Sequence, residues 1–159
     1  MHKIKFSFSV SVIALILFLS SCKKDDASPS PGGSLGTYAG SIQVTDDPVT
    51  KLGYIYNAKV AVSTSGSTIT VKVTGDLSFD REYTGTITTS QSGQYYSTLT
   101  KQTKPTDKTV GGSIIILGNE LAITVNSVSD NVNVKDPNTS QNISITGKVG
   151  MIGTNLIKQ

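Results

Sequence analysis

The feature that most constrains this chain is a two-residue alternation of apolar and polar side chains that begins at Leu35 and recurs along most of the sequence. In the segment 69–73, for example, every second residue is apolar, and Thr70 and Lys72 lie between. Such alternation is typical of β-strands with one buried face, and no stretch of helical length carries an apolar stripe with a 3.6-residue period. The sequence therefore predicts an all-β domain.

Short turn sequences separate the alternating segments. Ser65-Gly66 and Gly118-Asn119 each lie between two segments with matching apolar faces, which predicts two β-hairpins. The polar segments 101–108 and 129–142 are interpreted as loops, and the residues after 149 as a tail. We expect about eight strands, joined mostly as sequence neighbours.

Sequential hairpins with one apolar face are compatible with a closed up-and-down β-barrel or with a two-sheet β-sandwich. An immunoglobulin-type sandwich is disfavoured, because the chain has no tryptophan and one cysteine. The order Leu-Gly-Thr-Tyr-Ala-Gly at 35–40, followed by a meander of short strands, resembles the small lipocalin-like (calycin-type) barrel domains of bacterial lipoproteins. This resemblance covers roughly residues 35–150. It implies an up-and-down meander that closes into a barrel of about eight strands, with Tyr38 at the closed end.

Residues 1–21 have the organisation of a secretory signal. A basic start, which includes Lys3 and Lys5, precedes the apolar segment 10–19. A membrane-spanning helix needs roughly 20 apolar residues, so this segment is too short to span and is expected to be removed.

The order Leu19-Ser20-Ser21-Cys22 resembles a bacterial lipobox. In that motif a diacylglycerol is attached to the cysteine sulfur, the leader is cut before the cysteine, and the new amino group is acylated, for example with palmitate. Cys22 is the only cysteine, so it has no partner for an intramolecular disulfide. Several acyl chains on one residue are enough for stable anchoring. The resemblance therefore implies a lipoprotein that is anchored to a membrane through Cys22.

The residues after this cysteine, Lys23, Lys24, Asp25 and Asp26, resemble the export signal of Bacteroidota-type surface lipoproteins. This implies a location in the outer membrane with exposure at the cell surface. The stretch that follows is rich in Pro, Gly and Ser, so we expect a disordered tether. The predicted organisation is a signal peptide at 1–21, a lipidated tether at 22–34 and a single β-barrel domain at 35–159.

Charge and composition exclude several function classes. Lys3 and Lys5 account for two of the 14 basic residues, which leaves the rest nearly balanced against 11 acidic ones. The chain has no basic stripe, so we expect no nucleic-acid binding. The only histidine, His2, lies in the leader, which excludes Ser-His-Asp and Cys-His nucleophilic sites and the usual transition-metal centres. We therefore expect no enzyme activity, no metal and no cofactor.

The order Asp80-Arg81-Glu82 places two carboxylates on one face of an extended segment and the arginine on the other. Such a pair suits acid–base chemistry or Ca²⁺ binding only within a larger constellation. The flanking residues are ordinary turn sequence, so we interpret the segment as a solvated turn.

Tyrosines and neighbouring apolar residues provide the candidate ligand site. Tyr54, Tyr56 and Val60 are interpreted as sharing one strand face. A row of tyrosines is suited to stacking on a sugar or to lining an apolar pocket. The candidate ligand-binding residues are Tyr38, Tyr54, Tyr56, Val60, Ile69 and Val71.

The leading hypothesis is a non-catalytic, lipid-anchored barrel that binds a small apolar or amphipathic molecule, or a glycan fragment, in its mouth. The alternative is a protein–protein interaction module, such as an inhibitor or accessory lipoprotein, whose barrel is filled and whose outer face or segments 101–108 and 129–142 contact a surface protein. An eight-stranded barrel can be filled by its own side chains or hold one small ligand. The two hypotheses differ in the interior, since ligand binding there requires a cavity of ~300 Å³ or more.

Overall fold

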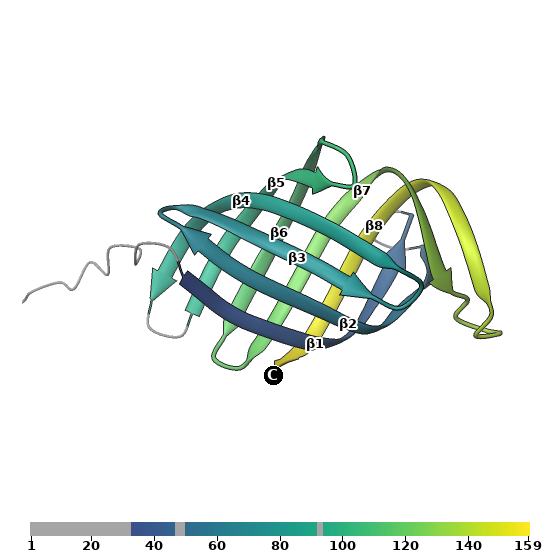
Figure 1. Ribbon diagram of the computed structural model, residues 1–159, viewed down its shortest axis with the longest axis horizontal. Helices are drawn as coiled ribbons and strands as arrows, with labels where there is room; N and C mark the ends of the chain where they lie inside the picture. The colour runs from purple at the N-terminus through teal and green to yellow at the C-terminus, as the bar shows by residue number, and fades with distance from the viewer. Residues whose placement is uncertain (1–32, 47–49, 92–93) are drawn as a thin grey trace, which may run out of the picture.

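Eight antiparallel strands, connected in sequence order, close into a β-barrel (Figure 1). This computed structural model describes residues 33–46, 50–91 and 94–159 of the 159-residue chain. The predicted up-and-down barrel is confirmed, and the sandwich alternative is wrong. The strands are β1 (Gly33–Thr45), β2 (Lys51–Ser65), β3 (Thr68–Gly75), β4 (Phe79–Gln91), β5 (Gln94–Lys104), β6 (Lys108–Leu117), β7 (Glu120–Lys135) and β8 (Asn142–Lys158).

Pairing between β1 and β8 closes the barrel. Tyr38 pairs with Lys158, and Val44 pairs with Met151. The residues after 149, expected to form a tail, therefore belong to the strand that completes the sheet. That expectation was wrong because Met151, which is 2% exposed, is part of the core and not of a solvated end.

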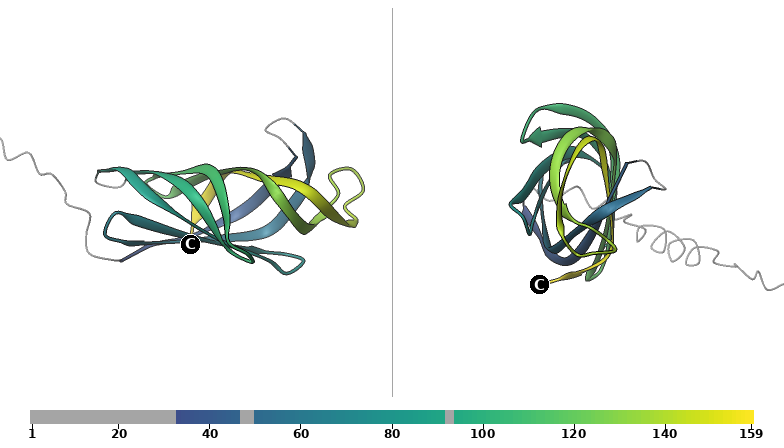
Figure 2. Two further views of the ribbon diagram at one scale, coloured as in Figure 1. Left: turned by 90° about the horizontal axis from the view of Figure 1, so that it is seen from above. Right: turned by 90° about the vertical axis from the view of Figure 1, so that its right-hand side faces the viewer.

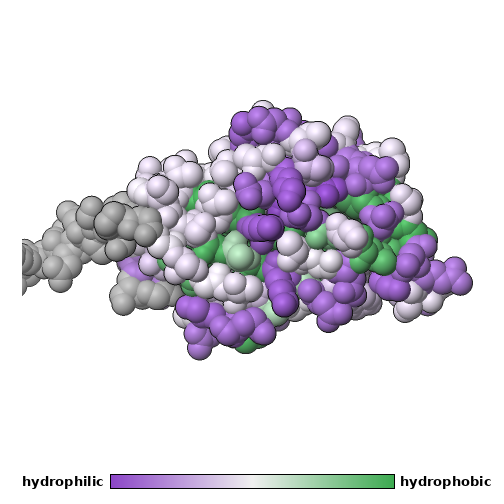
Figure 3. Space-filling model, in the orientation of Figure 1, coloured by the Kyte–Doolittle hydropathy of each residue, from purple (hydrophilic) through white to green (hydrophobic). Residues whose placement is uncertain are grey.

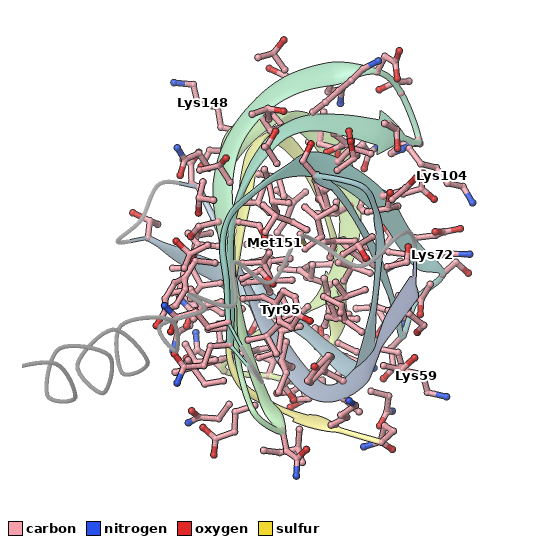
Figure 4. All side chains as sticks on the ribbon, turned by 90° about the vertical axis from the view of Figure 1, so that its left-hand side faces the viewer. Lys59, Lys72, Tyr95, Lys104, Lys148 and Met151 are labelled. Carbon is pink, nitrogen blue, oxygen red and sulfur yellow. The ribbon has the colours of Figure 1, made fainter. Side chains whose placement is uncertain are left out.

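The interior of the barrel is packed with aliphatic and aromatic side chains from all eight strands. Figure 4 looks into the barrel from the left-hand side of Figure 1, and shows Met151 and Tyr95 inside while Lys59, Lys72 and Lys104 point outward. Many core residues are β-branched, which suits a pleated surface with one buried face. The inward and outward residues alternate along the strands, as the sequence predicts for a small barrel.

The connections between strands define two ends of the barrel. The turns at 66–67 and 118–119, both predicted, lie at the same end as the start of β1, where Gly33 pairs with Thr64. We call this the amino-terminal end. The barrel thus begins at Gly33, inside the predicted tether 22–34. The connections that follow β1, β3, β5 and β7 lie at the opposite end.

The segment 129–142 is a long hairpin and not a loop. β7 continues to Lys135 and β8 begins at Asn142, so only residues 136–141 connect the two strands, which pair with each other up to Lys135 and Asn142. We call residues 128–149 the arm, which extends beyond the barrel at the end opposite the amino terminus (Figure 2). The loop prediction was wrong because Val132 and Val134 are the only buried apolar residues between 129 and 142, and most of the other side chains in this segment are polar.

The segment 101–108, also predicted as a loop, consists mostly of strand. β5 continues to Lys104 and β6 begins at Lys108, which leaves only residues 105–107 between them. Gln102 occupies an inward position beside Tyr83 and is 1% exposed. The prediction was wrong because a polar residue fills a position at which an alternating pattern normally has an apolar one.

Candidate functional site

The predicted membrane anchor lies in a part of the chain outside the described residues. This applies to Cys22, to the export signal Lys23, Lys24, Asp25 and Asp26, and to the signal peptide at 1–21. These assignments stay predictions.

Four of the predicted ligand-binding residues belong to the packed core. Val60, Ile69 and Val71 have no exposed surface, and Tyr38 is 1% exposed. A side chain that lines a cavity of water size exposes surface to that cavity, so the barrel is filled around these residues. Their role in ligand binding stays a prediction, and it would require core side chains to move.

A β-bulge changes the direction of the side chains in the middle of β2. Gly40 of β1 pairs with Ala58, but Ile42, two residues further on, pairs with Ile55. β2 therefore has one residue more than β1 over this interval, and Asn57 within it has a φ of 50°. An extra residue reverses the alternation of inward and outward side chains.

As a result, Tyr54 and Tyr56 lie on the outer face of the barrel, whereas Ile55 and Val60 point inward. The predicted face shared by the tyrosines and Val60 is therefore wrong. The sequence contains one signal for the bulge, because asparagine is among the few residues that tolerate a positive φ. Without that bulge both tyrosine rings would be in the core.

The two tyrosines form a stacked pair on the outer wall. The ring centroids of Tyr54 and Tyr56 are 5.8 Å apart and the ring planes differ by 28°. The ammonium group of Lys51 lies 5.1 Å from the centroid of the Tyr54 ring. The side-chain amide of Asn57 donates hydrogen bonds to both carboxylate oxygens of Asp76, at 3.1 and 3.2 Å, and so ties the bulge to the connection after β3.

A groove of about 420 Å³ lies beside the exposed edge of this pair, and we call it the Tyr56 groove. Tyr56 is 38% exposed and contributes an aromatic ring. The other lining side chains include a hydroxyl, two amides and an ammonium group, and Lys59 makes no ion pair within the part of the chain that the structure describes. The lining residues are Ala39, Gly40, Ser41, Tyr56, Asn57, Lys59 and Gln159.

A smaller hollow of about 210 Å³ lies at the amino-terminal end of the barrel. Leu35, Ile87 and Tyr95 are among its lining residues. The Tyr38 hydroxyl donates a long hydrogen bond of 3.4 Å to the carbonyl oxygen of Leu35, and burial together with the nearby Tyr95 raises the pKa of Tyr38. The hollow is smaller than ligand pockets of ~300 Å³ or more, so it offers little room for an interior ligand.

The opposite end of the barrel is covered by the arm, which a buried ion pair holds in place. Nε of Arg81 is 2.9 Å from Oδ2 of Asp130, and both side chains are 9% exposed. A second guanidinium nitrogen donates a 2.9 Å hydrogen bond to the carbonyl oxygen of Asn131. The guanidinium carbon lies 4.9 Å from the centroid of the Phe79 ring, and Lys108 lies 3.4 Å from the other oxygen of Asp130.

The segment Asp80-Arg81-Glu82 is therefore part of strand β4 and not the solvated turn that we expected. Asp80 pairs with Lys104 at 2.5 Å, and the hydrogen bond from Lys104 lowers the pKa of Asp80. Glu82 accepts a 2.9 Å hydrogen bond from the hydroxyl of Thr103. Both carboxylates thus have structural partners, and Arg81 separates them by pointing inward.

Within residues 33–46, 50–91 and 94–159, no three histidine, cysteine, aspartate or glutamate side chains gather in a way that could hold a metal ion. The same ranges contain no helix of sufficient length and hydrophobicity to cross a membrane.

The fold and the outer-face groove define a filled, eight-stranded antiparallel barrel with an aromatic surface site. Comparisons with protein-family models, with curated proteins and with solved structures gave no match.

Proposed function

We propose that this chain is a lipid-anchored, surface-exposed and non-catalytic lipocalin-like barrel that binds carbohydrate on its outer wall. The observation that carries the proposal is the stacked pair of Tyr54 and Tyr56 beside a polar groove of about 420 Å³. The bulge at Asn57 keeps these rings out of the core, where apolar side chains would otherwise surround them.

The chemistry of the Tyr56 groove fits a sugar better than an apolar molecule. A tyrosine ring offers an apolar face and a polar hydroxyl, and so suits a ligand with C–H faces and hydroxyl edges. Ser41, Asn57 and Lys59 supply hydrogen-bonding groups around the ring. An apolar ligand would bury these groups without partners, at a cost of about 1–3 kcal/mol each. On the face seen in Figure 3, hydrophobic residues form only small areas among hydrophilic ones.

The proposed anchor is compatible with access to this site. If Cys22 carries the lipid, residues 23–32 connect the membrane to Gly33, at the amino-terminal end of the barrel. The Tyr56 groove lies on the side wall, so the anchored barrel keeps it open to large ligands outside the cell.

The test is affinity electrophoresis through gels that contain soluble xylan, pullulan, arabinogalactan or mucin. We expect at least one polysaccharide to retard the wild-type protein. Tyr56→Ala should weaken binding by roughly tenfold, since aromatic contacts contribute about 0.5–1.5 kcal/mol beyond their buried area. Tyr96→Ala is the matched control, because Tyr96 is also 38% exposed on the outer face, on β5, but is not part of the stacked pair. Absence of retardation with all four polysaccharides, or equal losses in the two variants, would overturn the proposal.

The filled interior also supports a second candidate function, a protein–protein interaction module. Leu117 and Ile157 are each 47% exposed, and both lie beside the turn at 118–119. Cross-linking on intact cells should then give an adduct with a specific surface protein. Its loss in a Leu117→Ser/Ile157→Ser double variant, together with retained polysaccharide binding, would assign a separate partner surface.

A further inference from the structure

The outer wall has a second groove besides the Tyr56 groove. Its volume is about 320 Å³, and it lies where the arm leaves the barrel. The pairing of β7 with β8 is irregular between Val125 and Val128, and this irregularity opens the groove. We call it the Lys148 groove. Its lining residues are Thr45, Asp46, Thr124, Val125, Asn126, Ser127, Lys148 and Ile152.

The Lys148 groove is rich in groups that can hydrogen-bond to a ligand. Lys148 and Asp46 provide a cation and an anion, and neither side chain makes an ion pair with any other described residue. Thr124 and Asn126 add a hydroxyl and an amide, while Ile152 provides an apolar contact. Donors and acceptors beside an apolar contact suit a sugar unit, as in the Tyr56 groove. Figure 4 shows Lys148 pointing away from the barrel.

The outer face of β1 connects the two grooves. Ala39 and Ser41 line the Tyr56 groove, and Thr45 lines the Lys148 groove. Between them, Gln43 pairs with Tyr54 on one side and with Ile152 on the other. A row of outer-face positions on β1 therefore runs from the stacked tyrosines to the second groove, with Ser41 exposed, Gln43 half-buried and Thr45 buried.

The length of this row sets the size of the ligand that can occupy both grooves. A strand rises about 3.3 Å per residue, so Ser41 and Thr45 are separated by roughly 13 Å. The full distance from Ala39 to Asp46 is roughly 23 Å by the same measure. A single sugar ring cannot reach from one groove to the other, whereas a short linear chain can.

We infer that the carbohydrate is a linear oligosaccharide of at least three or four units that lies along the outer face of β1. This inference rests on the proposed function and adds a second subsite to it. One unit stacks beside Tyr56, the middle of the chain crosses Gln43, and the far unit is held by Lys148 and Thr124. Both grooves lie on the outer wall, so the chain can belong to a longer polysaccharide.

The test is isothermal titration of the intact protein with xylo-, malto- and cello-oligosaccharides of one to six units. We expect affinity in one series to rise at least tenfold between the disaccharide and the tetrasaccharide. Lys148→Ala and Thr124→Ala should remove this gain and leave the affinity for the disaccharide unchanged. Tyr56→Ala should weaken binding of both lengths. Lys72→Ala is the control for charge, because Lys72 is an exposed outer-face lysine on β3, which β1 and β2 separate from β8.

The outcomes separate the two proposals. Affinity that does not depend on chain length, or equal losses in Lys72→Ala and Lys148→Ala, overturns the extended site and leaves the Tyr56 site intact. Wild-type protein that binds none of the three series overturns the inference, and the four polysaccharide gels then decide whether the Tyr56 site falls with it. Far-UV circular dichroism of each variant shows whether a loss of binding comes from unfolding.

Discussion

Replacement of Asp130 by asparagine is expected to destabilise the protein by about 3 kcal/mol. Removing one partner of a buried ion pair typically costs about 3–5 kcal/mol, because the remaining charge is left without compensation. Both side chains of the Arg81–Asp130 pair are 9% exposed, so solvent can compensate little of that charge. The lower end of the range applies because Arg81 keeps its hydrogen bonds to the carbonyl oxygens of Asp80 and Asn131.

The opposite variant, Arg81→Met, should cost less, about 1–2 kcal/mol. Asp130 would keep the Lys108 ammonium at 3.4 Å and the hydrogen bond from the Asn131 backbone N–H at 2.9 Å, so its charge retains two partners. The double variant Arg81→Met/Asp130→Leu should be close to the wild type, since well-packed apolar residues often replace a buried pair without loss. Equilibrium unfolding in urea, followed by far-UV circular dichroism, gives the change in the free energy of unfolding for each of the three variants. The comparison holds when the denaturant dependence, the m value, is the same for all of them.

The pH dependence provides an independent check on the same pair. Burial raises the pKa of Asp130, but the hydrogen bonds from the Asn131 N–H and from Arg81, together with the charges of Arg81 and Lys108, outweigh this and leave the pKa below its ordinary value. A depressed pKa in the folded state stabilises the fold above the unfolded pKa, and this stabilisation is lost as the pH falls through the folded pKa. The difference in the free energy of unfolding between the wild type and Asp130→Asn should therefore stay constant from pH 7 to about pH 4. It should become smaller below that pH.

Two results would refute this reasoning. The first is an Arg81→Met variant that is destabilised as much as Asp130→Asn, which would mean that Lys108 does not support the carboxylate. The second is a difference in the free energy of unfolding between the wild type and Asp130→Asn that becomes larger as the pH is lowered.

Three further predictions concern other parts of the molecule. Tyr83→Phe should cost less than about 1 kcal/mol at neutral pH, because the hydroxyl makes a weak 3.9 Å hydrogen bond to a methionine sulfur. Burial raises the pKa of Tyr83, so its neutral hydroxyl contributes stability that is lost as the pH increases above the unfolded pKa of about 10. Urea titrations at pH 10–11 should therefore show a smaller loss of stability, relative to neutral pH, in the variant than in the wild type. Gly85→Ala should destabilise by about 3 kcal/mol or more in the same assay, because its Cβ would overlap the backbone carbonyl of Thr98, whereas Gly33→Ala, with no atom within 4 Å, should be neutral. Cys22→Ala should release the protein from the membrane fraction on cell fractionation, and continued membrane association would disprove the proposed anchor.

The alternation in the sequence was sufficient to predict the fold class, the inward faces of most strands and two hairpins. It failed where one residue breaks the period. The extra residue at Asn57 places Tyr54 and Tyr56 on the outer face. The polar Gln102 occupies an inward position, so the end of β5 was predicted as a loop. The two-residue alternation does not indicate where a bulge lies. The local sign of a bulge is a residue that tolerates a positive φ.

The ion pair beneath the arm could not be predicted from the sequence for a different reason. Arg81 and Asp130 are 49 residues apart and meet only because the arm covers the end of the barrel. The direction in which the arm lies is fixed by contacts such as the pairing of Tyr54 with Lys135, which no local pattern encodes. The two outer grooves depend on the same long-range geometry.

The pairing of β1 with β8 also sets an order of events for folding of the chain. The first strand cannot pair with its second neighbour until β8, which ends at Lys158, is available. A chain that is still being synthesised, or one cut before β8, is therefore an open sheet with two unpaired edges. Such edges can pair with other chains until β1 and β8 close the barrel. Completion of the chain is therefore a condition, set by the topology, for a closed barrel without unpaired strand edges.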